Sequence, residues 1–129
     1  MVQVAIITGA GSGIGLACAK ALADTGMAIL GVGRDPEKLR MMEVAIGQPE
    51  RITTLSVDLT EQDAPRRITD LALDRWGHID FLINNAGVGR PKPLHETDDD
   101  TLHHSLDITL RAPFRLTRRS EERRVGKEC

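Results

Sequence analysis

A glycine-rich segment near the N-terminus, residues 8–15, has the residue types and spacing to bind a phosphate group. It reads Thr-Gly-Ala-Gly-Ser-Gly-Ile-Gly, so glycine occupies every second position from Gly9 to Gly15. A glycine inside a regular element costs about 0.5–1 kcal/mol relative to alanine, so four of them need a reason in the backbone. An apolar run precedes the segment and an amphipathic run follows it, which predicts a tight turn that opens a helix. Backbone N–H groups and the helix dipole at such a turn attract a pyrophosphate; a flexible surface turn is the alternative.

Three further groups of polar or small residues follow apolar runs that read as strands. They are Arg34, Asp58, and the segment Asn84-Asn85-Ala86-Gly87. In a parallel sheet the carboxyl ends of the strands meet at one edge, where ligands bind at the point at which the strand order reverses. We therefore expect these groups to gather beside the glycine-rich turn.

The elements that must position these groups alternate between strand and helix patterns. Strands are expected over residues 2–8, 27–32, 51–57 and 79–83, and helices over residues 13–25, 36–46 and 61–76, with a last helix starting near residues 98–100. Asp35 can cap the helix that Pro36 begins, and Asp98 to Asp100 suit a helix start. Such alternation predicts right-handed βαβ units and an α/β fold with a parallel sheet.

Composition limits the function classes. Aromatic residues make up 2% of the 129 residues, so Val, Ile, Leu and Ala must fill the core of one domain. A net charge of −2 gives no field for nucleic acid or a membrane surface. Cys18 and Cys129 form no disulfide framework and have no metal-ligand spacing, so no metal site is expected. Neither a signal peptide nor a membrane span is indicated, and a cytoplasmic location is the expectation.

The motifs together resemble the N-terminal half of a short-chain dehydrogenase/reductase. The family pattern Thr-Gly-x-x-x-Gly-x-Gly is matched by Thr8, Gly9, Gly13 and Gly15, and its Asn-Asn-Ala-Gly signature by residues 84–87. The resemblance covers about residues 2–118. It implies a Rossmann-type three-layer αβα fold, truncated to about four strands in the order 3-2-1-4, with residues 1–118 as a partial NAD(P)-binding domain.

The resemblance also implies which residues contact the cofactor. Asp58 would bond to the adenine amino group, the Leu59 N–H would face the ring, and residues 85–87 would line the ribose side. The asparagines would also tie the central strands together, and both roles can hold at once. The full expected set is Gly9, Gly11, Ser12, Gly13, Ile14, Gly15, Arg34, Asp58, Leu59, Asn85, Ala86 and Gly87.

The residue after the second strand indicates the choice of cofactor. An acidic residue there would bond to the ribose hydroxyls of NAD, but this chain has Gly33 followed by Arg34, whose guanidinium suits a 2′-phosphate. NADP(H) is therefore favoured over NAD(H). Asp35 can either point at the ribose or cap the following helix.

The catalytic half of the family pattern is missing from this sequence. The family transfers hydride between the nicotinamide and a carbonyl or secondary alcohol, with a tyrosine as general acid/base and a lysine four residues later. This chain has no tyrosine, and the position of the family's relay asparagine falls on Thr109. The Thr109 hydroxyl can hold a water, or the side chain can pack on a helix face. No other residue of the chain is a catalytic candidate.

The apolar helical pattern of the last element ends after Arg118. Residues 119–129 resemble the translation of a sequencing-adapter oligonucleotide, which makes them an artefactual tail; a solvated charged tail is the alternative. A fourth strand left without its neighbour would expose an edge. We therefore expect the chain alone to be poorly soluble or partly molten and to lack reductase activity.

Three functional interpretations follow. The first is the NADP(H)-binding half of an oxidoreductase acting on a small carbonyl or alcohol substrate, in a parent that forms a homo-oligomer, as the family implies. The second is a non-catalytic dinucleotide-binding or sensing module on the same fold. The third is a non-functional gene fragment.

Overall fold

Four short parallel strands form the central layer of the protein. In the computed structural model, which describes residues 1–88 and 91–123, they are β1 (Val4–Thr8), β2 (Ala28–Gly33), β3 (Ile52–Ser56) and β4 (Phe81–Ile83). The spatial order is β3-β2-β1-β4, and every neighbouring pair is parallel. The predicted parallel α/β sheet in the order 3-2-1-4 is therefore confirmed.

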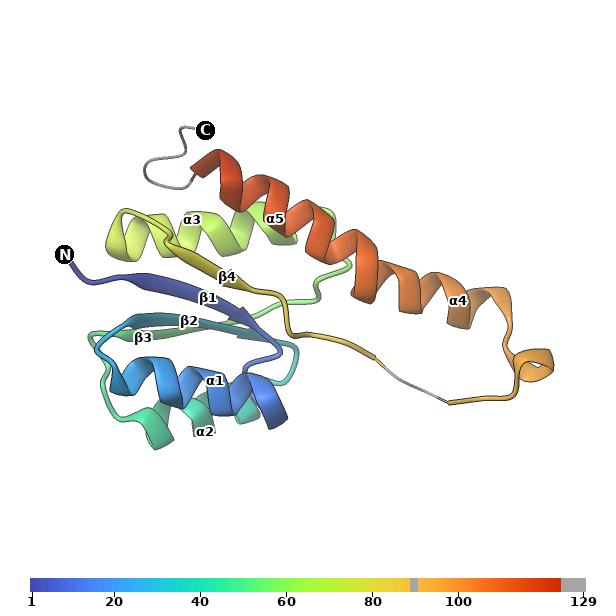
Figure 1. Cartoon of the computed structure of the whole chain (residues 1–129), viewed down its shortest axis with the longest axis horizontal. Helices are drawn as coiled ribbons and strands as arrows, with labels where there is room; N and C mark the ends of the chain where they lie inside the picture. The colour runs from blue at the N-terminus through green and yellow to red at the C-terminus, as the bar shows by residue number, and fades with distance from the viewer. Residues whose placement is uncertain (89–90, 124–129) are drawn as a thin grey trace.

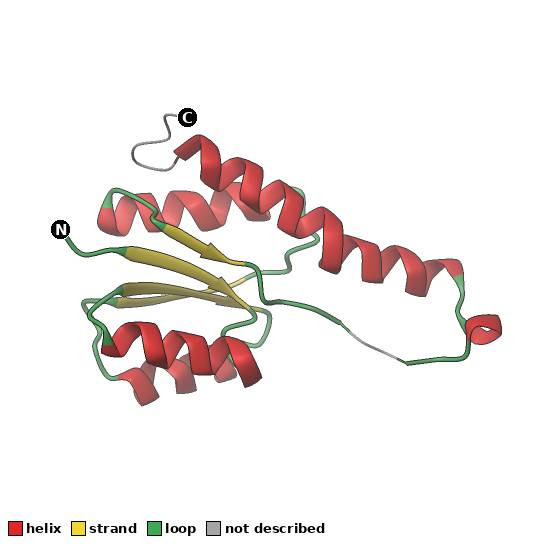
Figure 2. Ribbon diagram, viewed as in Figure 1, coloured by secondary structure: helices red, strands yellow, loops and turns green. Residues whose placement is uncertain are grey.

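Helices lie on both faces of this sheet. The chain forms α1 (Gly13–Asp24), α2 (Pro36–Ile46), α3 (Ala64–Trp76), α4 (Asp99–Leu106) and α5 (Ala112–Arg123), with a 3-10 turn η1 (Leu94–Glu96) and a π-helical turn η2 (Asp107–Arg111), and α4 extends beyond the sheet (Figure 1). Figure 1 shows α1 and α2 on one face and α3 and α5 on the other, and Figure 2 shows the same three layers by secondary structure. Because β1 is buried on both sides, Ala5 and Ile7 pack in one core while Ile6 packs in the other.

All four strands and α3 begin one to three residues later than the sequence predicts, and the shifts of β4 and α3 have an identifiable cause. β4 starts at Phe81 instead of residue 79, and the Val4 N–H donates to Asp80 Oδ2 at 2.8 Å instead of to a carbonyl. Helix α3 starts at Ala64 instead of residue 61, because Pro65 has no N–H and suits the first turn of a helix.

The last expected helix is interrupted by η2. Pro113 has no N–H to donate to the Thr109 carbonyl, and its ring would clash with that carbonyl in a regular helix. The Ala112 N–H instead donates to the Asp107 carbonyl five residues earlier, which widens the turn. The helix then continues past Arg118 to Arg123, since residues 119–123 contain neither glycine nor proline.

Both predicted aspartate caps are present. Asp35 Oδ1 accepts the N–H groups of Glu37 at 3.0 Å and of Lys38 at 3.4 Å. Asp98 Oδ1 accepts the Thr101 N–H at 2.8 Å, and hydrogen bonds from Thr101 lower the pKa of the Asp98 carboxyl. These bonds satisfy N–H groups that a helix start leaves without an internal partner.

Two histidines lie in turns of the chain, where the sequence shows no partner for either, and the structure gives His78, in the turn before β4, several partners. His78 is 5% exposed, with Nδ1 3.0 Å from the Trp76 carbonyl oxygen and Nε2 2.8 Å from that of Val2. Its Nε2 also lies 3.0 Å from Asp80 Oδ2. The ring joins the start of β1 to the approach to β4. His95 is 82% exposed and lies 3.7 Å from Glu96 Oε1.

Candidate functional site

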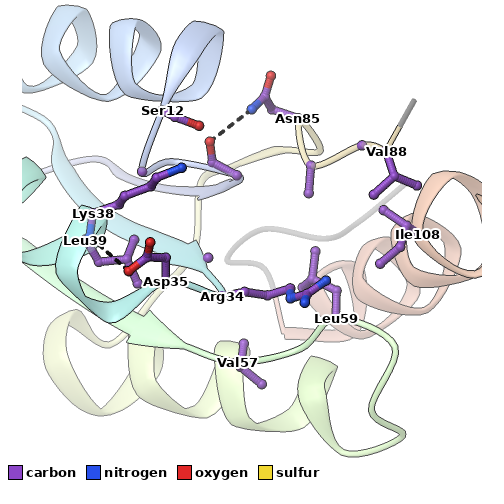
Figure 3. Close-up of a pocket in the computed structure, with 15 residues that line it drawn as sticks. Ser12, Arg34, Asp35, Lys38, Leu39, Val57, Leu59, Asn85, Val88 and Ile108 are labelled. Carbon is purple, nitrogen blue, oxygen red and sulfur yellow. Dashed lines mark hydrogen bonds between the residues drawn. The ribbon is translucent and has the colours of Figure 1, made fainter. Parts of the chain in front are cut away.

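A cavity of about 350 Å³ opens at the carboxyl ends of β1, β2 and β3. Its walls come from segments far apart in the sequence, and Figure 3 shows their side chains converging on one hollow. The lining residues are Gly9, Gly11, Ser12, Gly33, Arg34, Asp35, Lys38, Leu39, Val57, Leu59, Asn85, Ala86, Gly87, Val88 and Ile108. The predicted gathering of the strand-end groups at one edge is therefore observed.

Two positions of the glycine-rich turn require glycine, one because of its backbone conformation and one because of a close approach between segments. Gly9 has a φ of +64°, a conformation that L side chains rarely adopt. A Cβ on Gly15 would overlap the Gly9 carbonyl oxygen and lie 2.5 Å from Asn85 Nδ2. The first turn of α1 can therefore lie directly against the turn after β1 and the loop after β4.

The start of α1 presents free hydrogen-bonding groups beside the cavity. Ser12 is the N-cap residue, but its side chain makes no capping hydrogen bond, and the first turn of the helix contains no acidic residue. The Leu16 N–H is the first to bond within the helix, to the Ser12 carbonyl at 3.2 Å. The positive end of the helix dipole is thus left without an anion from its own helix, an arrangement that suits a phosphate.

A buried hydroxyl joins the glycine turn to the loop after β4. Thr8 is 2% exposed, and its Oγ1 accepts the N–H groups of Asn85 and Ala86, both at 3.0 Å. Asn85 Nδ2 donates in return to the carbonyls of Thr8 and Gly9, both at 3.2 Å. Asn84 Nδ2 donates to Thr117 Oγ1 of α5 at 3.1 Å. The asparagines therefore hold β4, β1 and α5 together, as expected.

The segment after β2 brings both signs of charge to the cavity. Arg34 and Lys38 are exposed and line it together with Asp35. Asp35 is engaged by its cap of α2, and so the capping alternative raised by the sequence is the observed one. Figure 3 shows Arg34 extending toward Leu59.

The aspartate after β3 is held by its own turn. Asp58 Oδ1 accepts the N–H of Thr60 at 2.9 Å and its hydroxyl at 2.7 Å. These two bonds, with a smaller contribution from the charge of Arg34, lower the pKa of the Asp58 carboxyl. Asp58 does not line the cavity, whereas Leu59 does.

The expected site residues thus fall into two groups. Eight of them line the cavity, namely Gly9, Gly11, Ser12, Arg34, Leu59, Asn85, Ala86 and Gly87. Gly13, Ile14, Gly15 and Asp58 do not line it, and the Ile14 side chain is 75% exposed. Gly13 to Gly15 instead form the first turn of α1, from which only backbone N–H groups face a ligand.

Thr109, the position of the family's relay asparagine, lies elsewhere. It is exposed on η2 and lines a separate groove with Phe114 and Thr117, so it does not pack into the interior. Its neighbour Ile108 is 4% exposed and does line the cavity. Sequence reasoning missed Ile108, Lys38 and Leu39, because their contact with the cavity depends on how the helices lie against the sheet.

The part of the chain that the structure describes contains neither a metal-ligating cluster nor a membrane-spanning helix. Residues 1–88 and 91–123 hold no cluster of three metal-ligating side chains. No helix within those ranges has the length and apolar character that crossing a membrane requires.

Comparison with known proteins decides the family. The family model described as short chain dehydrogenase matches residues 3–123. This chain belongs to the short-chain dehydrogenase family. A curated relative, the fatty acyl-CoA reductase of Acinetobacter baylyi, is 40% identical over 113 residues, which are 87% of this chain and 38% of the relative.

Solved structures of short-chain dehydrogenases share the fold. One from Brucella melitensis superposes with a TM-score of 0.92 at 33% identity, covering 95% of this chain and 52% of that one. A metagenomic short-chain oxidoreductase in complex with NADP has a TM-score of 0.84 at 36% identity, covering 91% and 54%. A 3-ketoacyl-(acyl-carrier-protein) reductase from Brucella melitensis, complexed with NADH, has a TM-score of 0.85 at 29% identity, covering 90% and 47%. The chain thus spans about half the length of these structures and 38% of the curated relative.

Proposed function

We propose that this chain is the NADP(H)-binding half of an oxidoreductase that transfers hydride between the nicotinamide and a carbonyl or secondary alcohol. The observation that carries the proposal is the combination, in one cavity, of the uncapped start of α1, the Asn85 to Gly87 segment and the guanidinium of Arg34. Residues 1–118 would form this partial cofactor domain and residues 119–129 a tail of separate origin.

The chemical types of the cavity residues and their positions suit a bound dinucleotide. The first-turn N–H groups of α1 would hold the pyrophosphate, as at other helix starts. Leu59, Val57 and Ile108 supply apolar walls for a flat base. The 12 residues assigned to the cofactor from the sequence keep those roles as part of this proposal, and the bonds from Thr60 hold Asp58 in the turn that presents Leu59. The cofactor, when bound, supplies the hydride chemistry, and this chain's residues bind and orient it.

Arg34 gives the test of cofactor preference. A guanidinium on a phosphate is a charge-assisted bond that contributes about 1.5–3 kcal/mol, or roughly a ten- to hundredfold change in affinity. Calorimetric dissociation constants for NADP⁺ and NAD⁺ are compared before and after Arg34→Ala. We expect the NADP⁺ constant to rise at least tenfold while the NAD⁺ constant changes little. An unchanged ratio of the two constants would contradict the assignment.

A non-catalytic nucleotide-binding module is the second candidate. It is favoured by Thr109, which stands at the expected position of the family's relay asparagine and is exposed away from the cavity. On both proposals the 129-residue chain binds nucleotide without turnover. Sequencing the gene past the codon for Arg118 separates them: a serine strand followed by Tyr-x-x-x-Lys supports the enzyme, and an intact frame without it supports the module. A frame that stops there supports a non-functional fragment.

A homo-oligomeric parent is also part of the proposal. Leu102, Leu106, Leu110 and Phe114 are spaced four residues apart along α4, η2 and α5, and their exposed fractions run from 40% to 65%. An apolar stripe of this kind is characteristic of an interaction surface. Sedimentation of the full-length parent with and without Leu110→Glu tests this: a monomeric wild-type parent would contradict the proposal.

A further inference from the structure

Lys38 places a second positive charge at the wall of the cavity. It lies in the first turn of α2, lines the cavity with Ser12 and Arg34, and is exposed. Figure 3 shows its side chain directed toward the glycine turn near Ser12, whereas Arg34 extends toward Leu59. The two cations therefore approach the cavity from different sides.

The Lys38 side chain begins close to the glycine turn. A Cβ added to Gly11 would lie 3.0 Å from Lys38 Cβ, a separation tighter than most real contacts between such atoms. The base of the Lys38 side chain thus lies against the turn at a position where the turn has no side chain of its own. From there the side chain is directed toward the turn near Ser12 (Figure 3).

The acidic groups near Lys38 are already engaged. Glu37 pairs with Arg40, with Oε1 2.5 Å from Nη2 and Oε2 3.1 Å from Nε. Asp35 accepts backbone N–H groups at the start of α2. Among residues 1–88 and 91–123 neither Lys38 nor Arg34 has an ion pair. Both side chains are therefore available to bind an anion from solution.

We propose that Lys38 is a specificity-determining residue that binds the 2′-phosphate of NADP(H) from the side of the glycine turn, while Arg34 binds it from the end of β2. This inference rests on the proposed function. A phosphate has three acceptor oxygens, which a lysine ammonium and an arginine guanidinium can share from two directions. NAD(H) has no group at that position and gains nothing from Lys38.

Two small probes isolate this contact in the 129-residue chain. The compounds 2′,5′-ADP and 5′-AMP differ only in the 2′-phosphate, and their dissociation constants are measured by calorimetry. We expect Lys38→Gln to weaken 2′,5′-ADP about tenfold, as the loss of one charge-assisted bond implies, and to leave 5′-AMP unchanged. Lys38→Arg keeps the charge and should retain most of the affinity.

A matched control removes a lysine that does not line the cavity. Lys20 is exposed on α1, so Lys20→Gln changes the net charge equally but should alter neither constant. Gly11→Ala, which pushes against the Lys38 stem, should lower the affinity for 2′,5′-ADP relative to 5′-AMP in the same direction as Lys38→Gln.

The possible results separate the two proposals. If Lys38→Gln leaves both constants unchanged, or weakens both probes equally, Lys38 does not contact the 2′-phosphate and the inference is overturned. If the folded wild-type chain, checked by circular dichroism, binds neither probe, the proposed function itself fails and the inference fails with it. A selective loss in Lys38→Gln with an unchanged Lys20→Gln supports both.

Discussion

Replacing Thr8 by valine tests whether the buried hydroxyl holds the two halves of the candidate cofactor site together. Valine keeps the shape of threonine but cannot accept a hydrogen bond. The substitution therefore removes the acceptor shared by the N–H groups of Asn85 and Ala86, each 3.0 Å from Thr8 Oγ1. Valine fills the same space in the core around position 8. The expected loss of stability therefore comes from the two N–H groups that lose their acceptor.

The size of the effect follows from burial. A buried N–H left without a partner costs about 1–3 kcal/mol. Thr8 is 2% exposed, so water cannot replace its oxygen from the side of the core, but Asn85 and Ala86 are only half-buried. For two such groups we expect a loss of about 2–4 kcal/mol in the free energy of unfolding, a large share of the 5–15 kcal/mol typical of a domain.

Urea titration followed by circular dichroism measures this loss, with Thr8→Ser as the matched control. Serine keeps the oxygen and loses one methyl group, which should cost about 1 kcal/mol. If Thr8→Val is unfolded without urea, titration with an excluded osmolyte recovers the midpoint. A Thr8→Val variant that is as stable as Thr8→Ser would refute the reasoning.

Three further predictions concern single residues. Gly15→Ala should abolish nucleotide binding and destabilise the chain, because the added Cβ would overlap the Gly9 carbonyl oxygen. Gly87→Ala has open space around it and should leave stability unchanged. Thermal melts compare the stability of the two variants, and calorimetry compares their nucleotide binding. The fold lowers the pKa of the Asp58 carboxyl, so the ionised carboxylate stabilises the folded chain. This contribution to the free energy of unfolding is complete above the ordinary carboxyl pKa and is lost as the pH falls through the lowered value. Asp58→Asn should therefore flatten the acid limb of a stability–pH curve, and an unchanged curve would disprove this. His78→Leu should cost about 1–3 kcal/mol by leaving part-buried carbonyl oxygens unpaired. His95 is exposed, so His95→Leu should cost almost nothing in the same urea assay.

The element pattern was readable from the sequence because it depends on local chemistry. The continuous apolar run of β1, the aspartate cap and proline start of α2, and the glycines that end α2 and α3 all act within a few residues. The start of β4 depended on a distant residue. The Asp80 carboxylate accepts the Val4 N–H from the neighbouring strand β1, and no window of sequence around residue 80 contains that information.

The same division applies to the site. The glycine spacing and the Asn-Asn-Ala-Gly segment by themselves predicted a glycine-rich turn with free helix N–H groups at a sheet edge, since a helix start and its free N–H groups are local properties. Tertiary structure alone decided that Thr8 would bridge that turn to Asn85, 77 residues away, and that His78 would be buried. It also decided that Lys38 would lie against the turn at Gly11 and that Ile108 would face the cavity while Thr109 would not. Those outcomes depend on the angles at which α2 and η2 meet the sheet, which are set by packing among residues distant in the chain.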